Sequence, residues 1–218
     1  MKVSAVLRRG LAGVLGACFS LAASAADGSS QEWRFAVSLD GKPIGEHRFV
    51  LRERAGLREL TSEANFRVRF LFIDAYRYQH RAREVWRGDC LERLDARTDD
   101  NGDEVVVSGE RTGAVFRVAT DGAVAGFERC VLTFAYWNPR ILDATRLLNP
   151  QTGEYLPVQV LALGRESLGE YPDAQRYRLL GDAGGKPLQI DLWYTPAREW
   201  LALESLTPDG RRLRYSKL

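Results

Sequence analysis

The sequence predicts an all-β protein with one short helix, built as an antiparallel meander that forms a half-open barrel or β-clam. About twelve short segments alternate apolar and polar residues, which is the period of a half-buried strand. Gly, Asp, Asn and Pro turns separate these segments about every 8 to 12 residues, as in barrels and sandwiches. A length of 218 residues fits a single domain of this class.

The amino end reads as a secretory signal peptide over residues 1–25. Lys2, Arg8 and Arg9 supply the positive region, Gly10 to Ala22 is apolar, and Ala23–Ala25 has the small residues of a cleavage site. We therefore expect a signal peptide cleaved after Ala25, a linker over 26–31, one β domain over 32–218, and a periplasmic location.

An alternative processing route involves Cys18. Leu15 to Cys18 resembles a lipoprotein box, but Phe19 to Ala22 stay apolar where a lipid-linked tether is usually polar, so we favour cleavage after Ala25. Cleavage there removes three basic residues and no acidic ones, which changes the formal charge from +2 to −1. We therefore expect no nucleic-acid partner and no transmembrane segment in the mature chain.

Two cysteines, Cys90 and Cys130, follow the leader. In an oxidising compartment the simplest interpretation is a disulfide between them, closing a loop of about 40 residues for about 4 kcal/mol in the chain-entropy model. A metal-binding or reactive thiol pair is the alternative. No His lies at ligand spacing from either cysteine and there is no CxxC motif, so we predict neither a metal nor a cofactor.

The first half of the chain predicts long hairpins. Glu32 to Glu53 forms the first, around a turn at Asp40 to Pro43. Leu60 to Phe72 and Tyr76 to Trp86 are the next two strands, connected by Ile73 to Ala75. The remaining strands are expected over Cys90–Thr98, Glu104–Glu110, Ala114–Thr120, Tyr155–Leu163, Gln175–Leu180, Leu188–Tyr194, Trp200–Leu206 and Arg212–Leu218.

The stretch from Phe127 to Val158, called here the central stretch, interrupts this pattern. It contains the helix signal: Asn138 as the N-cap, Pro139 at the first position, and an apolar stripe that continues to Leu148. A helix of about ten residues is not stable alone in water. We expect it to lie against a sheet face or to fill an open end of the barrel.

One face of the Tyr76 to Trp86 strand is amphiphilic, while the opposite face carries arginines and must be solvated. Tyr and Trp rings with polar tips suit either a ligand cavity or a solid core, and the sequence leaves both open. The candidate ligand-binding residues are Tyr76, Tyr78, His80, Glu84, Trp86, Tyr136, Trp137, Asn138 and Trp193.

Catalytic and metal-site motifs are absent from the sequence. His80 and Glu84 could act as an acid–base pair, but four residues along one strand place them about 13 Å apart. Asp99 to Asp103 resembles a calcium loop without the spacing or closing Glu of an EF-hand, and reads as a hairpin turn. No GxSxG, HExxH, Walker or GxGxxG motif occurs, so we predict no catalytic residue.

Three segments together carry a family resemblance: LDGKPIG, AYWNP with LLNPQTGE, and IDLWYTP with WLALESLTPDGRRLRY. They resemble a family of secreted proteobacterial proteins catalogued as a domain of unknown function, and more distantly a second uncharacterised envelope family. The resemblance implies a periplasmic β domain. Its architecture is similar in outline to lipoprotein-carrier β-clams, which warrants no function by itself.

The resulting hypothesis is a periplasmic, non-catalytic β-clam that binds an apolar or amphipathic ligand, lipid-derived molecules included, under the helix of the central stretch. Two alternatives stay open. One is a structural or interaction module of the envelope with a solid core, and the other is a hydrolase that uses His80 and Glu84.

Overall fold

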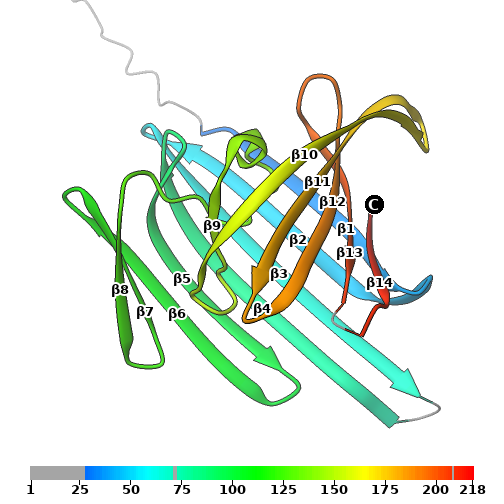
Figure 1. The fold of residues 1–218 in the computed structure, drawn as a ribbon, viewed down its shortest axis with the longest axis horizontal. Helices are drawn as coiled ribbons and strands as arrows, with labels where there is room; N and C mark the ends of the chain where they lie inside the picture. Colours follow the sequence, from blue (N-terminus) through cyan, green and yellow to red (C-terminus); the bar gives the residue numbers. More distant parts are fainter. Residues whose placement is uncertain (1–27, 71–72, 208) are drawn as a thin grey trace, which may run out of the picture.

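The computed structural model describes residues 28–70, 73–207 and 209–218, and is almost entirely β-structure (Figure 1). One sheet contains every strand. The strands are β1 (Ser30–Leu39), β2 (Lys42–Arg54), β3 (Leu57–Phe70), β4 (Ile73–Arg87), β5 (Cys90–Asp100), β6 (Asp103–Thr112), β7 (Val115–Thr120), β8 (Ala123–Glu128), β9 (Arg146–Leu148), β10 (Tyr155–Leu168), β11 (Tyr171–Ala183), β12 (Lys186–Tyr194), β13 (Trp200–Leu206) and β14 (Arg212–Lys217), with one 3₁₀ helix, η1 (Pro139–Asp143).

The 14 strands run in the order β8-β7-β6-β5-β4-β3-β2-β1-β14-β13-β12-β11-β10-β9. Each neighbouring pair is antiparallel, and β1 pairs with β14 through registers such as Val37 with Tyr215. The first and last strands therefore meet in the middle of the sheet, while β8 and β9 are its two edges. The predicted all-β fold, a half-open antiparallel meander, is confirmed.

The alternation of apolar and polar residues along each strand decides which side of the strand faces inward. On β1, Trp33, Phe35 and Val37 are buried while Arg34 is exposed. The same pattern on β4 buries His80, Ala82, Glu84 and Trp86 and exposes the arginines between them. The sheet thus has one apolar concave face and one charged outer face, as a half-buried antiparallel sheet requires.

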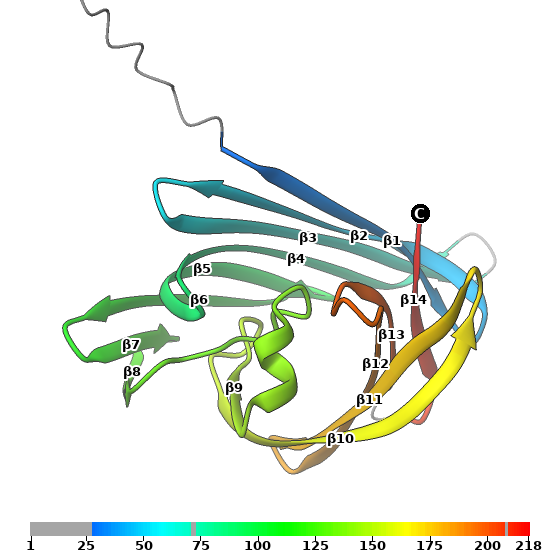
Figure 2. The same ribbon diagram turned by 90° about the horizontal axis from the view of Figure 1, so that it is seen from above.

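The gap between the edge strands is closed by side chains and by the central stretch. The ring of Phe127 on β8 lies 4.4 Å from the ring of Tyr155 on β10. Thr133 forms a parallel bridge with Leu148, whose N–H donates to the carbonyl of Leu132 at 2.8 Å. Figure 2 shows the sheet curving from β5 through β1 and β14 to β10, with the segment between β8 and β9 inside the curve.

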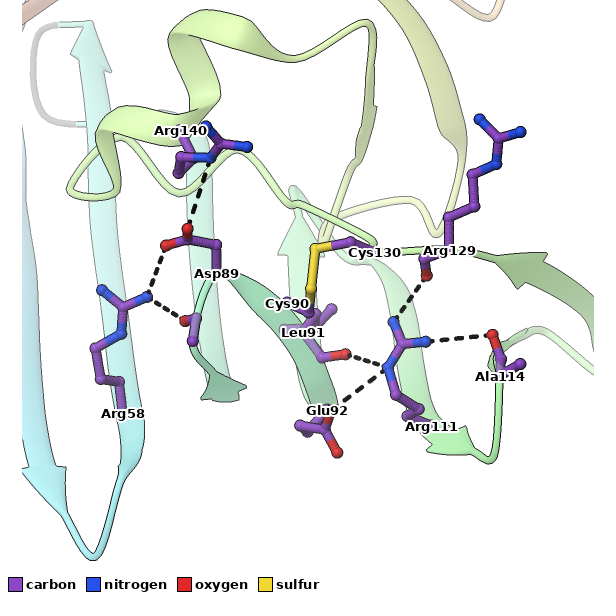
Figure 3. Close-up of a disulfide and its surroundings, with 11 residues drawn as sticks. Arg58, Asp89, Cys90, Leu91, Glu92, Arg111, Ala114, Arg129, Cys130 and Arg140 are labelled. Carbon is purple, nitrogen blue, oxygen red and sulfur yellow. Dashed lines mark hydrogen bonds and ion pairs between the residues drawn. A yellow bond between two sulfur atoms is a disulfide. The ribbon is translucent and has the colours of Figure 1, made fainter.

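The disulfide between Cys90 and Cys130 ties the central stretch to the start of β5 (Figure 3). Beside it, the Leu91 N–H donates to the Val131 carbonyl at 3.0 Å. The Arg111 guanidinium donates to the carbonyls flanking this link, those of Leu91 and Arg129, at 3.2 and 3.1 Å. The predicted disulfide is confirmed, and backbone bonds reinforce it.

The helix is shorter than the sequence suggested. Asn138 caps it as expected, with its side-chain oxygen accepting from the Arg140 N–H at 3.1 Å, but η1 ends at Asp143. Ala144 is extended, with ψ at 141°, and Arg146–Leu148 form β9 against β10. The prediction of a helix to Leu148 is wrong because strand pairing with β10 satisfies the backbone of the last three residues.

Two further details differ from the expected pattern. Ala123 to Glu128 form β8, which the sequence pattern did not predict, and Ile73 begins β4 where a connection was expected.

The expected signal peptide and Cys18 lie outside the described residues. Within the described ranges, none of the helical structure is long and apolar enough to cross a membrane.

Candidate functional site

Two adjoining cavities lie on the concave face of the sheet. The deep cavity has a volume of about 240 Å³ and is lined by β2–β4, β11–β14 and the central stretch. The mouth cavity has a volume of about 640 Å³ and is lined by residues of β1–β5 and β14 and by residues just before β14. His47, Gln151, Leu213 and Tyr215 line both cavities, so the two cavities adjoin at these residues.

The interior is closed at the disulfide end. Trp86 and Trp137 meet edge to face there, with ring centroids 5.6 Å apart, and both are buried. The Arg58 guanidinium covers the Trp137 ring at 4.8 Å and pairs with Asp89, which Arg140 also approaches (Figure 3). A ligand therefore cannot enter from the disulfide end.

The mouth cavity combines aromatic walls with a charged rim. The rings of Phe66 and Tyr78 stack at 5.4 Å along one wall. Burial raises the pKa of Tyr76, and the Asp100 carboxylate beside its hydroxyl raises that pKa further. Arg211 at the rim is held by Asp209 at 2.7 Å.

His47 lies at the junction of the two cavities and has a hydroxyl partner on each ring nitrogen. Nδ1 is 3.1 Å from the Tyr215 hydroxyl and Nε2 is 2.7 Å from Ser62 Oγ. Because hydroxyls both donate and accept, either neutral tautomer is satisfied. Burial and, secondarily, the nearby His80 hold the pKa of His47 well below its ordinary value, so the ring is neutral at pH 7.

A chain of hydrogen bonds runs from Ser62 through His47 to Tyr215. Enzymes with an activated nucleophile use a similar chain, in which a hydroxyl, an imidazole base and an orienting group follow one another. Two observations argue against that role. An imidazole with so low a pKa is a weak general base at neutral pH. Ser62 also pairs with Phe49 on one side and Ala82 on the other, so its backbone belongs to the sheet and supplies no oxyanion hole.

His80 is likewise a buried histidine with a hydroxyl partner. Its Nδ1 lies 3.0 Å from Thr98 Oγ1, and that hydroxyl lies 3.5 Å from the carbonyl of Gln151 in the loop after β9. Burial lowers the pKa of His80 to about 4, so it too is neutral at pH 7. This contact anchors the Asn149–Gly153 loop against the inner face of the sheet.

Glu84 is a buried acid, only 3% exposed, on the wall of the deep cavity. Oε2 accepts from the Trp86 indole N–H at 3.0 Å. Burial raises the pKa of Glu84 to about 7, against smaller lowering effects from Thr133 and Trp86. The Thr133 hydroxyl lies near the carboxyl but makes no hydrogen bond of standard geometry with any described residue. Glu84 is therefore partly protonated near pH 7.

The structure brings five of the nine predicted ligand residues to the cavities: Tyr76 and Tyr78 line the mouth cavity, and His80, Glu84 and Tyr136 line the deep cavity. His80 and Glu84 share that wall, but each has a different hydrogen-bond partner.

The other four predicted residues line neither cavity. Trp86, Trp137 and Asn138 belong to the closed end. Trp193 lies on the outer face, where its indole N–H donates to Glu166 at 2.6 Å and Arg176 covers its ring at 5.0 Å. The helix that was expected to cover a ligand lines neither cavity. The segment Phe134–Tyr136 and the loop Asn149–Gln151 line the deep cavity instead.

Sequence reasoning missed four residues at the centre of the site: His47, Ser62, Gln151 and Tyr215. His47 and Ser62 alternate in phase with buried neighbours such as Phe49 and could have been found from that pattern. The places of Gln151 and Tyr215 depend on contacts between distant segments, because His47 and Tyr215 are 168 positions apart. No local sequence signal predicts such contacts.

Comparisons with known proteins agree with this architecture. The chain is similar over residues 35–217 to the family described as "Domain of unknown function (DUF6134)". It is also similar to the crystal structure of a β-barrel-like protein of domain of unknown function DUF1849 from Brucella abortus. That match has a TM-score of 0.63 and 9% identity, and covers 86% of this chain and 94% of that one.

At 9% identity the likeness to the Brucella protein concerns the fold alone. No curated protein matches the chain. The family similarity spans nearly all of the described strands, which confirms the expected membership in an uncharacterised family. The chain belongs to the DUF6134 family, a domain of unknown function.

Proposed function

We propose that this protein is a periplasmic, non-catalytic binding protein that holds an apolar or amphipathic ligand, lipid-derived molecules included, inside its half-open barrel. The observation that carries the proposal is the pair of adjoining cavities, deep and mouth, on the concave face of the sheet. A protein whose aromatic residues served only as core would be expected to fill this space, because protein interiors are close-packed.

The lining suits an amphipathic molecule. Leu60, Ile190 and Leu203 supply apolar wall in the deep cavity, and Phe66 and Tyr78 continue it toward the mouth. Polar side chains such as His47, Ser62 and Gln151 lie among these apolar walls, so the lining offers both kinds of surface to a ligand. The deep cavity alone is small for a drug-sized ligand, so we expect the ligand to extend into the mouth cavity.

The periplasmic location rests on the leader-like composition of residues 1–25 and on the Cys90–Cys130 disulfide. Disulfides persist in oxidising compartments such as the periplasm and are rare in the cytosol of mesophiles. Fractionation of the producing cells, with the mature amino terminus read by mass spectrometry, tests this part. A mature chain that starts at Ala26 in the periplasmic fraction is expected, and recovery in the cytosol with Met1 retained would contradict it.

Binding is tested with 1-(phenylamino)naphthalene, a neutral dye that fluoresces in apolar surroundings. The wild-type protein should bind it saturably with one site per chain. Leu213→Trp places a larger side chain at the junction of the two cavities and should weaken binding at least tenfold. Val106→Trp is the matched control, because Val106 is 53% exposed on β6 and lines neither cavity.

Two outcomes would contradict the proposal. The first is no saturable binding by the wild type, and the second is equal binding by Leu213→Trp and Val106→Trp. Either result would favour the structural or interaction module, in which the same rings act only as core. Circular dichroism of both variants establishes that they are folded before their binding is compared.

A further inference from the structure

The deep cavity carries a hydrogen-bond acceptor that the protein leaves partly unused. Glu84 is 3% exposed and accepts from Trp86 through Oε2. Within the described residues, Trp86 is the donor whose hydrogen bond to the carboxyl is well formed, and the Thr133 hydroxyl beside the carboxyl has no well-formed partner of its own. Glu84 lines the cavity, so an occupant that donates a hydrogen bond to its carboxyl gains an interaction that the protein supplies only in part.

The described part of the same cavity wall carries no positive charge. Of the described residues that line the deep cavity, none is Lys or Arg. The two histidines on its wall, His47 and His80, are neutral at pH 7 because burial lowers their pKa values. In the mouth cavity the cation is Arg211, which Asp209 already neutralises, and Asp100 adds a further acid to that wall.

We infer that the ligand is an amphiphile whose inner end is a hydrogen-bond donor without negative charge, a hydroxyl or a primary amine, directed at Glu84. Its apolar part extends past Tyr215 and Leu213 into the mouth cavity. A carboxylate or phosphate head group in the deep cavity would meet Glu84 with no cation to compensate, and an uncompensated buried charge is strongly unfavourable. This inference rests on the proposed function and makes it more specific.

The test compares three compounds with the same twelve-carbon chain, dodecan-1-ol, dodecylamine and dodecanoate. Each displaces bound 1-(phenylamino)naphthalene at pH 8, below its micellar concentration. For the wild type, the better of the alcohol and the amine should displace the dye at a concentration at least tenfold lower than dodecanoate does. The difference between alcohol and amine identifies which donor the site takes.

The variant Glu84→Gln tests whether Glu84 sets the head-group preference or whether the compounds bind only through their apolar chains. The amide keeps the size of the side chain, can still accept from Trp86, and offers an N–H donor to an anionic head group. We expect the preference over dodecanoate to fall below threefold in Glu84→Gln. Glu63→Gln is the matched control, because Glu63 lies on the outer face of β3 and lines neither cavity, and it should keep the wild-type preference.

The outcomes are distinguishable. If dodecanoate displaces the dye as well as the better of the other two, or if Glu84→Gln keeps the wild-type preference, the assignment of the head group is overturned while the binding function stands. If the dye does not bind the wild type, or none of the three compounds displaces it, the proposed function fails and this inference fails with it.

Discussion

Glu84→Gln should remove a pH-dependent destabilisation from the folded protein. The Glu84 carboxyl has a pKa of about 7 in the fold, raised from the ordinary 4.5 chiefly by burial. Since each pKa unit corresponds to about 1.4 kcal/mol, ionising this group in the folded state costs about 3 kcal/mol of unfolding free energy.

The direction of the pH dependence follows from which state, folded or unfolded, binds the Glu84 proton more tightly. The folded state has the higher pKa, so the wild type keeps its full stability below about pH 4.5 and loses it as the pH rises to about 7. Gln does not ionise. The unfolding free energy of Glu84→Gln minus that of the wild type should therefore increase by about 3 kcal/mol between pH 4 and pH 8.

Urea unfolding of both proteins with the disulfide intact, followed by tryptophan fluorescence at each pH, measures this difference. Subtracting the wild type cancels the shared contributions of His47 and His80. The control Glu63→Gln should differ from the wild type by less than about 0.5 kcal/mol throughout, as surface substitutions usually do. A difference for Glu84→Gln that stays constant from pH 4 to pH 8 would show that Glu84 does not titrate as a buried acid, and would refute the reasoning.

Three other substitutions test separate parts of the structure. The double variant Cys90→Ser/Cys130→Ser should lose up to about 4 kcal/mol of unfolding free energy and the gel mobility difference between reduced and non-reduced protein; an unchanged urea midpoint would contradict the role of the disulfide. Gly109→Ala should lose about 1–3 kcal/mol, because its new Cβ would lie 2.7 Å from the Phe116 ring, whereas Gly126→Ala on the edge strand should lose less; equal losses would count against this packing. Ser62→Ala should lose about 1–3 kcal/mol by leaving His47 Nε2 without a partner, with exposed Ser108→Ala as its control; a neutral Ser62→Ala would show that the hydrogen bond does not matter.

The strand pattern of the first half could be predicted because alternation and turn chemistry are local. The Asp40–Gly41 turn takes positive φ at both positions, 50° and 78°, as does Asn101–Gly102 at 57° and 105°. β8 was missed because most of its side chains are exposed, so it has no apolar–polar alternation. Leu147 and Leu148 fit a helical stripe equally well, and only the distant partner β10 makes them a strand.

The candidate site was predicted in part for the same reason. β4 shows its inward face in its own sequence, so Tyr78, His80 and Glu84 were found. Trp193 was predicted as a ligand residue only because it is an aromatic ring with a polar tip. In the structure Ile190 to Tyr194 are all buried, so alternation of burial does not distinguish the two faces of this segment. Asp191 is buried on the outer face by ion pairs with Arg176 and Arg178, at 2.5 and 2.7 Å, which come from the neighbouring strand.

The central claim is that the interior of the half-open barrel holds a ligand. A crystal structure of the protein with 12-bromododecan-1-ol tests it most directly, because anomalous scattering locates the bromine atom. We expect a bromine peak in the mouth cavity near Tyr78, with the chain continuing past Tyr215 into the deep cavity. Bromine found only on the outer surface at a saturating concentration of the compound, with both cavities lacking density for the chain, would contradict it.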